Sequence, residues 1–130
     1  MDINQPPRFV ISLAWIYHGL FPKLLRVAPV EQEMTASFGF SEAVSYWITK
    51  GAGVGEVLFG IAFFFLYKER WINYMNIAAL SGLLAFVALF NTHLLVGAFN
   101  PVTTNLPLIA LSLVLLNNNL SKYIRKNEIS

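Results

Sequence analysis

The fold is decided by the stretch Gly51-Ala-Gly-Val-Gly-Glu56-Val-Leu-Phe-Gly60, which an apolar run extends to Tyr67. The segment is long and apolar enough to cross a bilayer, yet it carries a carboxylate well inside it. An isolated charge at the bilayer centre costs about 2.5–3.5 kcal/mol on insertion scales. Glu56 must therefore face other helices or a wet cavity, find a hydrogen-bond donor, or stay protonated.

The composition of the whole chain is that of a membrane protein. Of its 130 residues, 56% are hydrophobic and 12% are charged, and this charged fraction is about half that of average soluble proteins. The net charge of +2 is too small to suggest a nucleic-acid partner. The chain has no cysteine, which excludes thiol–disulfide chemistry and cysteine-ligated clusters by this chain.

Four apolar segments predict an all-α protein, an integral membrane four-helix bundle in which residues 1–130 form a single domain. The first segment does not resemble a signal peptide, because it contains Trp15 and no small-residue cleavage site follows it. Pro22 predicts a kink near its end. We expect transmembrane helices over residues 8–26, 45–67, 71–90 and 105–120, and a short interfacial helix over residues 31–40.

The basic residues predict the orientation of the bundle. With four spans, both termini lie on one face of the membrane. That face collects six basic residues, namely Arg8, Lys68, Arg70, Lys122, Arg125 and Lys126, against Lys23, Arg26 and Lys50 on the other. The positive-inside rule then places both termini in the cytoplasm, which means the inner membrane if the source is a bacterium.

Counting residues along the first two spans gives Glu56 a predicted partner. His18 lies 10 residues from Arg8 and 8 from Arg26, near the middle of the first span, and Glu56 lies near the middle of the second. The two spans are antiparallel, so these groups fall at similar depth. Lys23 lies one to two turns further outward, within side-chain reach of a carboxylate below it. We predict a buried His18–Glu56 contact with Lys23 above it.

The glycines of the second span predict close helix packing. On a 100° wheel, Gly53 and Gly60 share a face with Glu56. Gly51 and Gly55 lie nearly opposite, spaced as a small-xxx-small contact that would suit a second copy of the chain. The alternative is that these glycines reflect only the general frequency of glycine in membrane helices.

A second polar group is expected around the loop between the third and fourth spans. Together with Lys23, four residues would line the mouth of a cavity running down to Glu56, namely Asn91, His93, Asn100 and Asn105. The alternative is that the asparagines cap helix ends and turns, since Asn100-Pro101 is a common turn start.

No metal or haem site is predicted. His18, Glu56 and His93 are competent ligands, but they come from three helices without a local spacing motif. Haem ligation by two histidines would need matching depths, and the residue count puts His93 at the rim. A quinone tail could lie along Phe63-Phe-Phe65, although nothing in the sequence requires a quinone.

Three stretches resemble the DoxX-like family of small four-helix membrane proteins. They are Trp15-Ile-Tyr-His-Gly-Leu-Phe-Pro-Lys23-Leu-Leu at the family's opening, Gly55-Glu56-Val-Leu-Phe-Gly60 at its second helix, and Phe99-Asn-Pro-Val-Thr-Thr-Asn105-Leu-Pro-Leu at its last helix. The resemblance implies a four-helix membrane bundle. The broader DoxX/DoxD group includes members associated with quinone-linked respiratory or thiosulfate oxidation and with membrane redox complexes.

The family motifs fall on most of the residues that the sequence singles out. They cover His18, Lys23, Glu56, Asn100 and Asn105, whereas His93 is not part of the family pattern.

Three functions fit these patterns. The first is an accessory or small-molecule-binding membrane subunit, in which His18, Lys23 and Glu56 hold a small polar molecule or a quinone headgroup beside a membrane redox partner. The second is a proton-coupled transporter, which would need to form a homo-oligomer because four spans are few for a carrier. The third is a structural subunit whose buried ion pair only fixes the helix register. No pattern assigns a catalytic residue, and the lipid bilayer is the one partner that all three readings share.

Overall fold

A computed structural model describes residues 2–130, which form helices and no strand. The all-α prediction is therefore confirmed. Residues 2–130 contain five α-helices rather than the four of the predicted bundle, because the short helix expected after the first span is the fifth. In chain order the elements are α1 (Gln5–Gly19), the π-helix η1 (Leu20–Leu25), α2 (Pro29–Ala36), α3 (Glu42–Leu66), α4 (Arg70–Phe90), the 3₁₀-helix η2 (Thr92–Leu95) and α5 (Pro101–Ile129).

The chain divides into two compact units. Residues Ile11–Phe64 form one unit, here named the α1–α3 unit. Phe65–Ser130, together with the described part of Met1–Val10, form the other, here named the α4–α5 unit. The single domain expected from the chain length stays a prediction.

Three helices, α3, α4 and α5, are long and apolar enough to cross a membrane. α1 alone has 15 residues, but it continues directly into the six residues of η1. A helical stretch of that combined length measures about 30 Å, which matches the hydrocarbon core of a bilayer. That the first segment also crosses the membrane stays a prediction.

The first helix begins and ends differently from the predicted span. It begins at Gln5, because Pro6 and Pro7 occupy its first turn, where their missing N–H groups have no intrahelical acceptor to lose. The kink predicted at Pro22 takes the form of η1. Pro22 has no N–H for the bond to the preceding turn, and the wider π-turn accommodates the missing bond.

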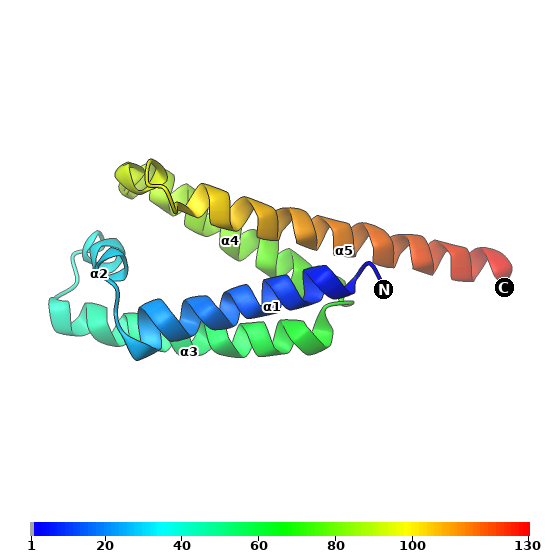
Figure 1. Cartoon of the computed structure of the whole chain (residues 1–130), viewed down its shortest axis with the longest axis horizontal. Helices are drawn as coiled ribbons and strands as arrows, with labels where there is room; N and C mark the ends of the chain where they lie inside the picture. The colour runs from blue at the N-terminus through cyan, green and yellow to red at the C-terminus, as the bar shows by residue number, and fades with distance from the viewer. Residues whose placement is uncertain (1) are drawn as a thin grey trace. The chain divides into compact units, whose positions relative to one another are not determined.

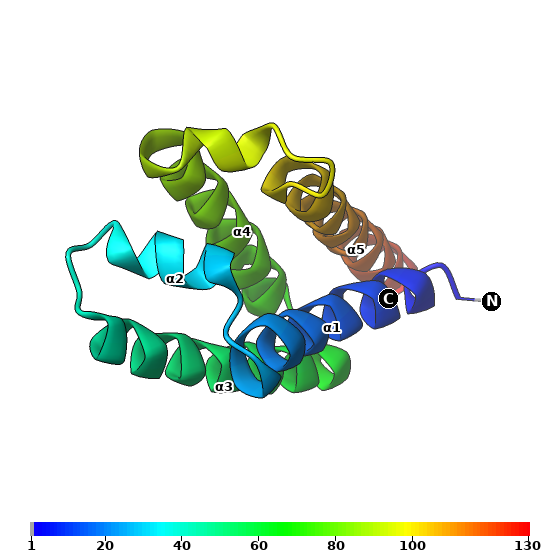
Figure 2. The same ribbon diagram turned by 60° about the vertical axis from the view of Figure 1, so that its left-hand side comes forward.

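The predicted interfacial helix is present as α2, over Pro29–Ala36 rather than 31–40. Gly39, with φ of 79°, turns the chain after α2 in a conformation that glycine adopts without steric cost. Ser41 caps α3, because its Oγ accepts the N–H of Val44 at 3.3 Å. Figure 1 and Figure 2 both show α2 beside the first turns of α3.

The last helix is longer at both ends than the predicted span 105–120. It begins at Pro101 because Asn100 caps it, with Oδ1 accepting the N–H of Val102 at 3.0 Å and of Thr103 at 3.1 Å. It continues to Ile129, since no proline or glycine follows residue 107 to stop it.

The asparagine run at 117–119 lies inside this helix and bonds to neighbouring segments. Asn118 Nδ2 donates to Asn4 Oδ1 at 3.2 Å. Asn119 Nδ2 donates to the carbonyl oxygen of Lys68 at 3.0 Å, in the turn between α3 and α4. Deeper in the same unit, Asn76 Nδ2 donates to Ser112 Oγ at 2.8 Å. This buried bond links α4 and α5, which lie side by side in Figure 1, and such polar links commonly hold membrane helices together.

Glycines let α1 and α3 pack backbone against backbone. A Cβ atom at Gly53 would lie 2.8 Å from the carbonyl oxygen of Gly19, and one at Gly60 would lie 2.8 Å from that of Ser12. Both distances are shorter than real Cβ contacts, so only glycine fits at these two positions. The predicted inward face of the second span is confirmed.

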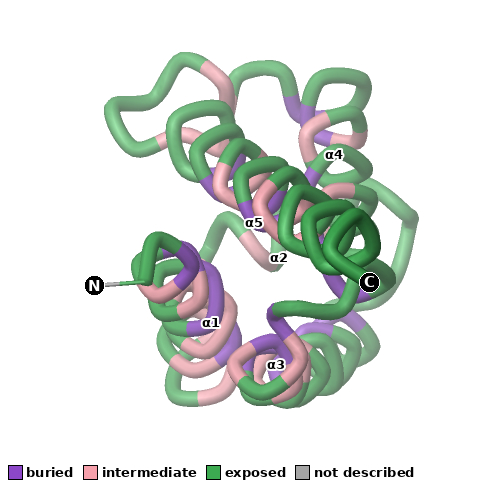
Figure 3. Tube along the Cα trace, turned by 90° about the vertical axis from the view of Figure 1, so that its right-hand side faces the viewer, coloured by how far each residue is buried: buried purple, intermediate pink, exposed green. Residues whose placement is uncertain are grey.

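The opposite face of α3 is open. Cβ atoms at Gly51 and Gly55 would meet nothing within 4 Å, and both glycines are exposed. Figure 3 shows that exposed residues make up most of α3, as expected where lipid covers the outer face of a membrane helix. A second copy at Gly51 and Gly55 stays a prediction.

The two glycine faces provide a matched pair of variants. Gly53→Ala is expected to destabilise the protein by about 1–3 kcal/mol, because the added methyl group overpacks the helix contact. Gly55→Ala adds the same methyl group to open space and is expected to be neutral or slightly stabilising. Thermal unfolding of both variants in the same lipid checks this, and equal losses of stability would contradict the packing argument.

Candidate functional site

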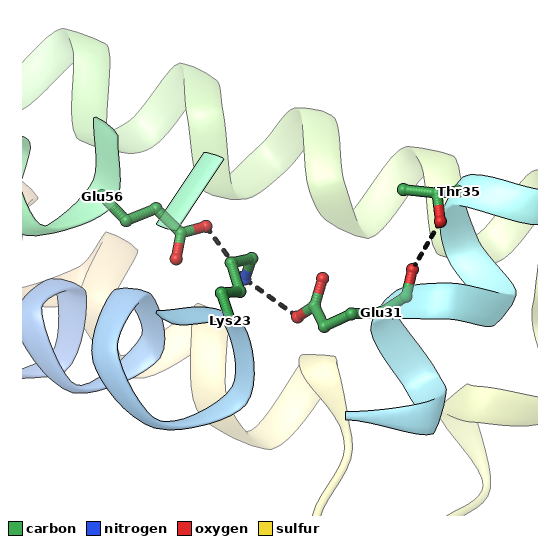
Figure 4. A network of polar contacts seen from close by, with 4 residues as sticks. All are labelled: Lys23, Glu31, Thr35 and Glu56. Atoms are coloured by element: carbon green, nitrogen blue, oxygen red, sulfur yellow. Dashed lines mark hydrogen bonds and ion pairs between the residues drawn. The ribbon is translucent and has the colours of Figure 1, made fainter. Parts of the chain in front are cut away.

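The candidate site is centred on Lys23, which bridges two carboxylates from different helices. Its Nζ lies 2.8 Å from Glu31 Oε1 and 3.1 Å from Glu56 Oε1. The Lys23 side chain is 9% exposed, and those of Glu31 and Glu56 are 19% and 21% exposed. Figure 4 shows the ammonium group between the two carboxyl groups. Lys23 therefore provides the cationic partner that the Glu56 carboxylate needs within the apolar helix α3.

Local structure explains why Lys23 reaches Glu56. A Cβ atom at Gly53 would also lie 2.9 Å from the Lys23 Cβ, so the Lys23 side chain starts directly at the surface of α3. Glu56 is three residues further along α3 and shares the face of Gly53. The π-helix η1 carries Lys23 and ends the first helix at this level. A second lysine ties the same segment, because Lys50 Nζ donates to the carbonyl oxygen of Leu24.

The third member of the cluster is supplied by α2. Glu31 lies in the first turn of this helix. The Thr35 hydroxyl donates to the Glu31 carbonyl oxygen at 3.0 Å, a bond within the helix that Figure 4 also shows. The short helix α2 therefore brings the carboxylate of Glu31 back to Lys23, near the end of the first helix.

One atom of the cluster is buried without a hydrogen-bond partner. Glu56 Oε2 accepts no hydrogen bond from any residue in 2–130. On the same face of α3, the hydroxyl groups of Ser45 and Thr49 are also buried and unpartnered within that range. Buried polar atoms are nearly always hydrogen-bonded, so this face has the capacity to bind a further polar group.

The predicted His18–Glu56 contact was wrong. No hydrogen bond or ion pair joins these two residues within the described chain, and Lys23 takes the place predicted for His18. Depth alone does not fix the direction of a side chain. Gly19 is the residue of α1 that lies against Gly53, so His18 is turned about 100° from this contact, whereas Lys23 follows Gly19 by four residues. His18 is half-buried, with its ring centroid 6.2 Å from that of Tyr17.

The other three candidates belong to the α4–α5 unit. Asn100 is the helix cap described above, which is the alternative that the sequence left open for it. Asn105 is buried in α5, where its Oδ1 accepts a hydrogen bond from the Thr104 hydroxyl at 3.2 Å. His93 lies on η2 and is exposed. A cavity mouth that joins these residues to Lys23 stays a prediction.

Comparison with known families identifies the chain. The model of the DoxX-like family matches residues 12–113, which is most of the chain. The chain belongs to the DoxX-like family. Neither the curated proteins nor the solved structures gave a significant match.

The match to the DoxX-like family includes all six candidate residues and the whole Lys23 cluster. Together with the apolar helices, it confirms that the protein is a helical integral membrane protein. Residues 2–11 and 114–130 lie outside the match, which therefore does not include the polar end of α5.

Sequence reasoning overlooked Glu31, Ser45 and Thr49. Glu31 is one of three carboxylates between the first two spans, with Glu33 and Glu42, and only the path of the chain through η1 and α2 shows that it returns to Lys23. Ser45 and Thr49 could have been found by extending the helical wheel, since they share a face with Gly53 and Glu56. No group of three or more histidine, cysteine or acidic side chains in residues 2–130 is arranged to hold a metal ion.

Removal of the central cation tests the cluster. Lys23→Met leaves two carboxylates facing each other without their shared donor, and we expect a loss of stability of about 1–3 kcal/mol. Arg26→Met removes the same charge from an exposed position of the same segment and is expected to change stability by less than about 0.5 kcal/mol. Thermal unfolding in lipid nanodiscs compares the two variants. If both behave alike, Lys23 is not the stabilising partner of Glu56.

Proposed function

We propose that this DoxX-like protein is an accessory membrane subunit that binds a small polar molecule at Glu56. The proposal rests on one observation, the buried Glu56 Oε2 that accepts no hydrogen bond within residues 2–130. An ion pair that served only to fix helix register would be expected to satisfy both of its oxygens. The site instead offers a carboxylate oxygen to a donor that the chain does not itself supply.

The charges of the Lys23 cluster limit the kind of molecule that can bind at Glu56. When all three groups are ionised, the cluster holds one positive and two negative charges, from Lys23, Glu31 and Glu56. An anionic ligand would meet a net negative charge and is disfavoured. A neutral molecule with a hydroxyl group is favoured, because a hydrogen bond to a carboxylate is stronger than one between neutral groups.

A quinol headgroup is the ligand that the surroundings of Glu56 support best. One turn further along α3, the Phe59 ring packs edge-on against Trp15 of α1, with centroids 4.8 Å apart, and lies 6.2 Å from the Phe63 ring. A flat ring with a hydroxyl group would find a hydrogen-bond acceptor and an aromatic surface within one helical turn. The quinone-linked redox systems associated with the broader DoxX/DoxD group are consistent with this choice. A membrane redox partner and cytoplasmic termini are part of the same proposal.

Replacement of the acceptor tests the proposed function. Glu56→Gln keeps the size of the side chain but turns one acceptor into a donor, so we expect the affinity for a short-chain quinol in nanodiscs to fall about tenfold or more. Glu33→Gln changes an exposed carboxylate on α2 in the same way and is expected to bind like the wild type. Isothermal titration calorimetry under conditions that keep the quinol reduced measures the binding.

Stability measured on the same samples separates the alternatives. Lost binding with unchanged thermal unfolding supports a ligand site. A fall in stability with unchanged binding supports a structural subunit instead, and unchanged binding in Glu56→Gln would refute the quinol assignment.

A proton-coupled transporter is the second candidate, and the excess of carboxylates over cations is the observation that favours it. Two carboxylates that share one lysine can take up a proton without loss of the ion pair. Proton flux into vesicles that contain the wild type, compared with Glu56→Gln, distinguishes transport from binding. Flux that depends on Glu56 would favour the transporter.

A further inference from the structure

A groove of about 600 Å³ lies in the α4–α5 unit and includes no residue of the Lys23 cluster in its lining. Three segments form it: the turn that follows α3, the first residues of α4, and the polar end of α5. Its walls are held in place by the bond from Asn119 Nδ2 to the carbonyl oxygen of Lys68, at 3.0 Å. The residues that line it are Lys68, Glu69, Arg70, Trp71, Asn119 and Tyr123.

The charges in this groove favour an anion. Lys68 and Arg70 are both exposed, and neither forms an ion pair with a described residue. The ammonium group of Lys68 lies 5.6 Å from the Tyr67 ring centroid, an interaction that leaves its hydrogen-bond donors available. Glu69 is the only acidic residue in the lining. The N-terminal end of α4 adds partial positive charge, and no side chain caps it.

The aromatic residues place the groove at the level of lipid headgroups. Trp71 is the second residue of a helix that can cross the membrane, and it is 51% exposed. Tyr123 is 62% exposed on the polar end of α5. Tryptophan and tyrosine concentrate where hydrocarbon meets water, with their polar atoms toward the headgroups. Cations and amphipathic rings therefore meet at the level where the phosphate of a lipid lies.

We propose that this groove binds the phosphate group of an anionic phospholipid, with Lys68 and Arg70 as the phosphate contacts and with Trp71 and Tyr123 against the glycerol and upper acyl chain. Basic residues beside a membrane-spanning helix attract anionic lipids. Arginine and lysine are the common phosphate binders of proteins. A free phosphate ion shares this chemistry, but it would gain nothing from the aromatic walls. The site is independent of the function proposed for Glu56.

Two double variants with equal changes of charge test the site. Purified protein in phosphatidylcholine nanodiscs is titrated with phosphatidylglycerol, and bound lipid is counted by native mass spectrometry. Lys68→Ala with Arg70→Ala is expected to weaken phosphatidylglycerol binding about tenfold or more. Arg125→Ala with Lys126→Ala removes the same charge from α5 outside the groove, and binding is expected to stay within about twofold of the wild type. Equal losses in both double variants would show attraction by general surface charge and would overturn the proposal.

Two further measurements separate the sources of phosphate and avoid reliance on folding of the variants. Inorganic phosphate at the concentration of the lipid is expected not to displace it, and displacement would overturn the lipid assignment. In the wild type, phosphatidylglycerol is expected to slow labelling of Lys68 by an amine reagent relative to labelling of Lys126. Equal rates of labelling at both lysines would contradict binding in the groove.

Discussion

The closest approach of two helices in the α1–α3 unit, between Gly19 and Gly53, determines the chemistry of the candidate site. Because neither residue has a side chain, the backbones touch and the next inward-facing residue of the first helix begins at the surface of the second. That residue is Lys23, and at this distance its ammonium group reaches Glu56. A larger residue at either glycine would separate the helices and leave a carboxylate in an apolar segment without its cation, which is among the costliest arrangements in a membrane. The contact between Gly19 and Gly53 therefore determines both the packing of the two helices and the pairing of Lys23 with Glu56.

The same geometry explains why the cluster takes two carboxylates rather than one. A lysine ammonium has three donors, and Glu56 uses only one of its oxygens to accept from it. The widened turn of η1 ends at Leu25, two residues after Lys23, so that α2 can return Glu31 to the same ammonium group. π-Turns within helices are frequent at functional sites, because they place side chains where a regular helix cannot. The second carboxylate makes the cluster negative overall, a property that a purely structural ion pair does not need.

Much of this arrangement can be predicted from the sequence, and the part that cannot has a physical reason. Periodicity and composition predict the helices, and the wheel predicts that Gly53, Glu56 and Gly60 face a neighbour. Whether Lys23 or His18 pairs with Glu56 depends on the rotation of the first helix about its axis. The contact at Gly19 sets this rotation, and it cannot be derived from the depth of each residue in the membrane. The position of Glu31 beside Lys23 depends on the π-helical turn η1, and tertiary packing determines where such a turn forms. The predicted last span ends at residue 120, earlier than α5 itself. The residues beyond it favour a helix, but they have no apolar face by which the sequence pattern would indicate one.

The charges around Glu56 decide what kind of ligand can approach it. Lys23 is already shared by two carboxylates, and Lys50 is engaged by the carbonyl oxygen of Leu24, so neither lysine is left to attract an anion. The group that remains without a hydrogen-bond partner is an acceptor, Glu56 Oε2. The hydroxyl groups of Ser45 and Thr49, which can also accept, lie on the same face of α3. A neutral hydrogen-bond donor suits this acceptor, because a hydrogen bond to a carboxylate is stronger than one between neutral groups. A carboxylate or phosphate ligand would instead meet the Glu56 carboxylate without an available cation beside it.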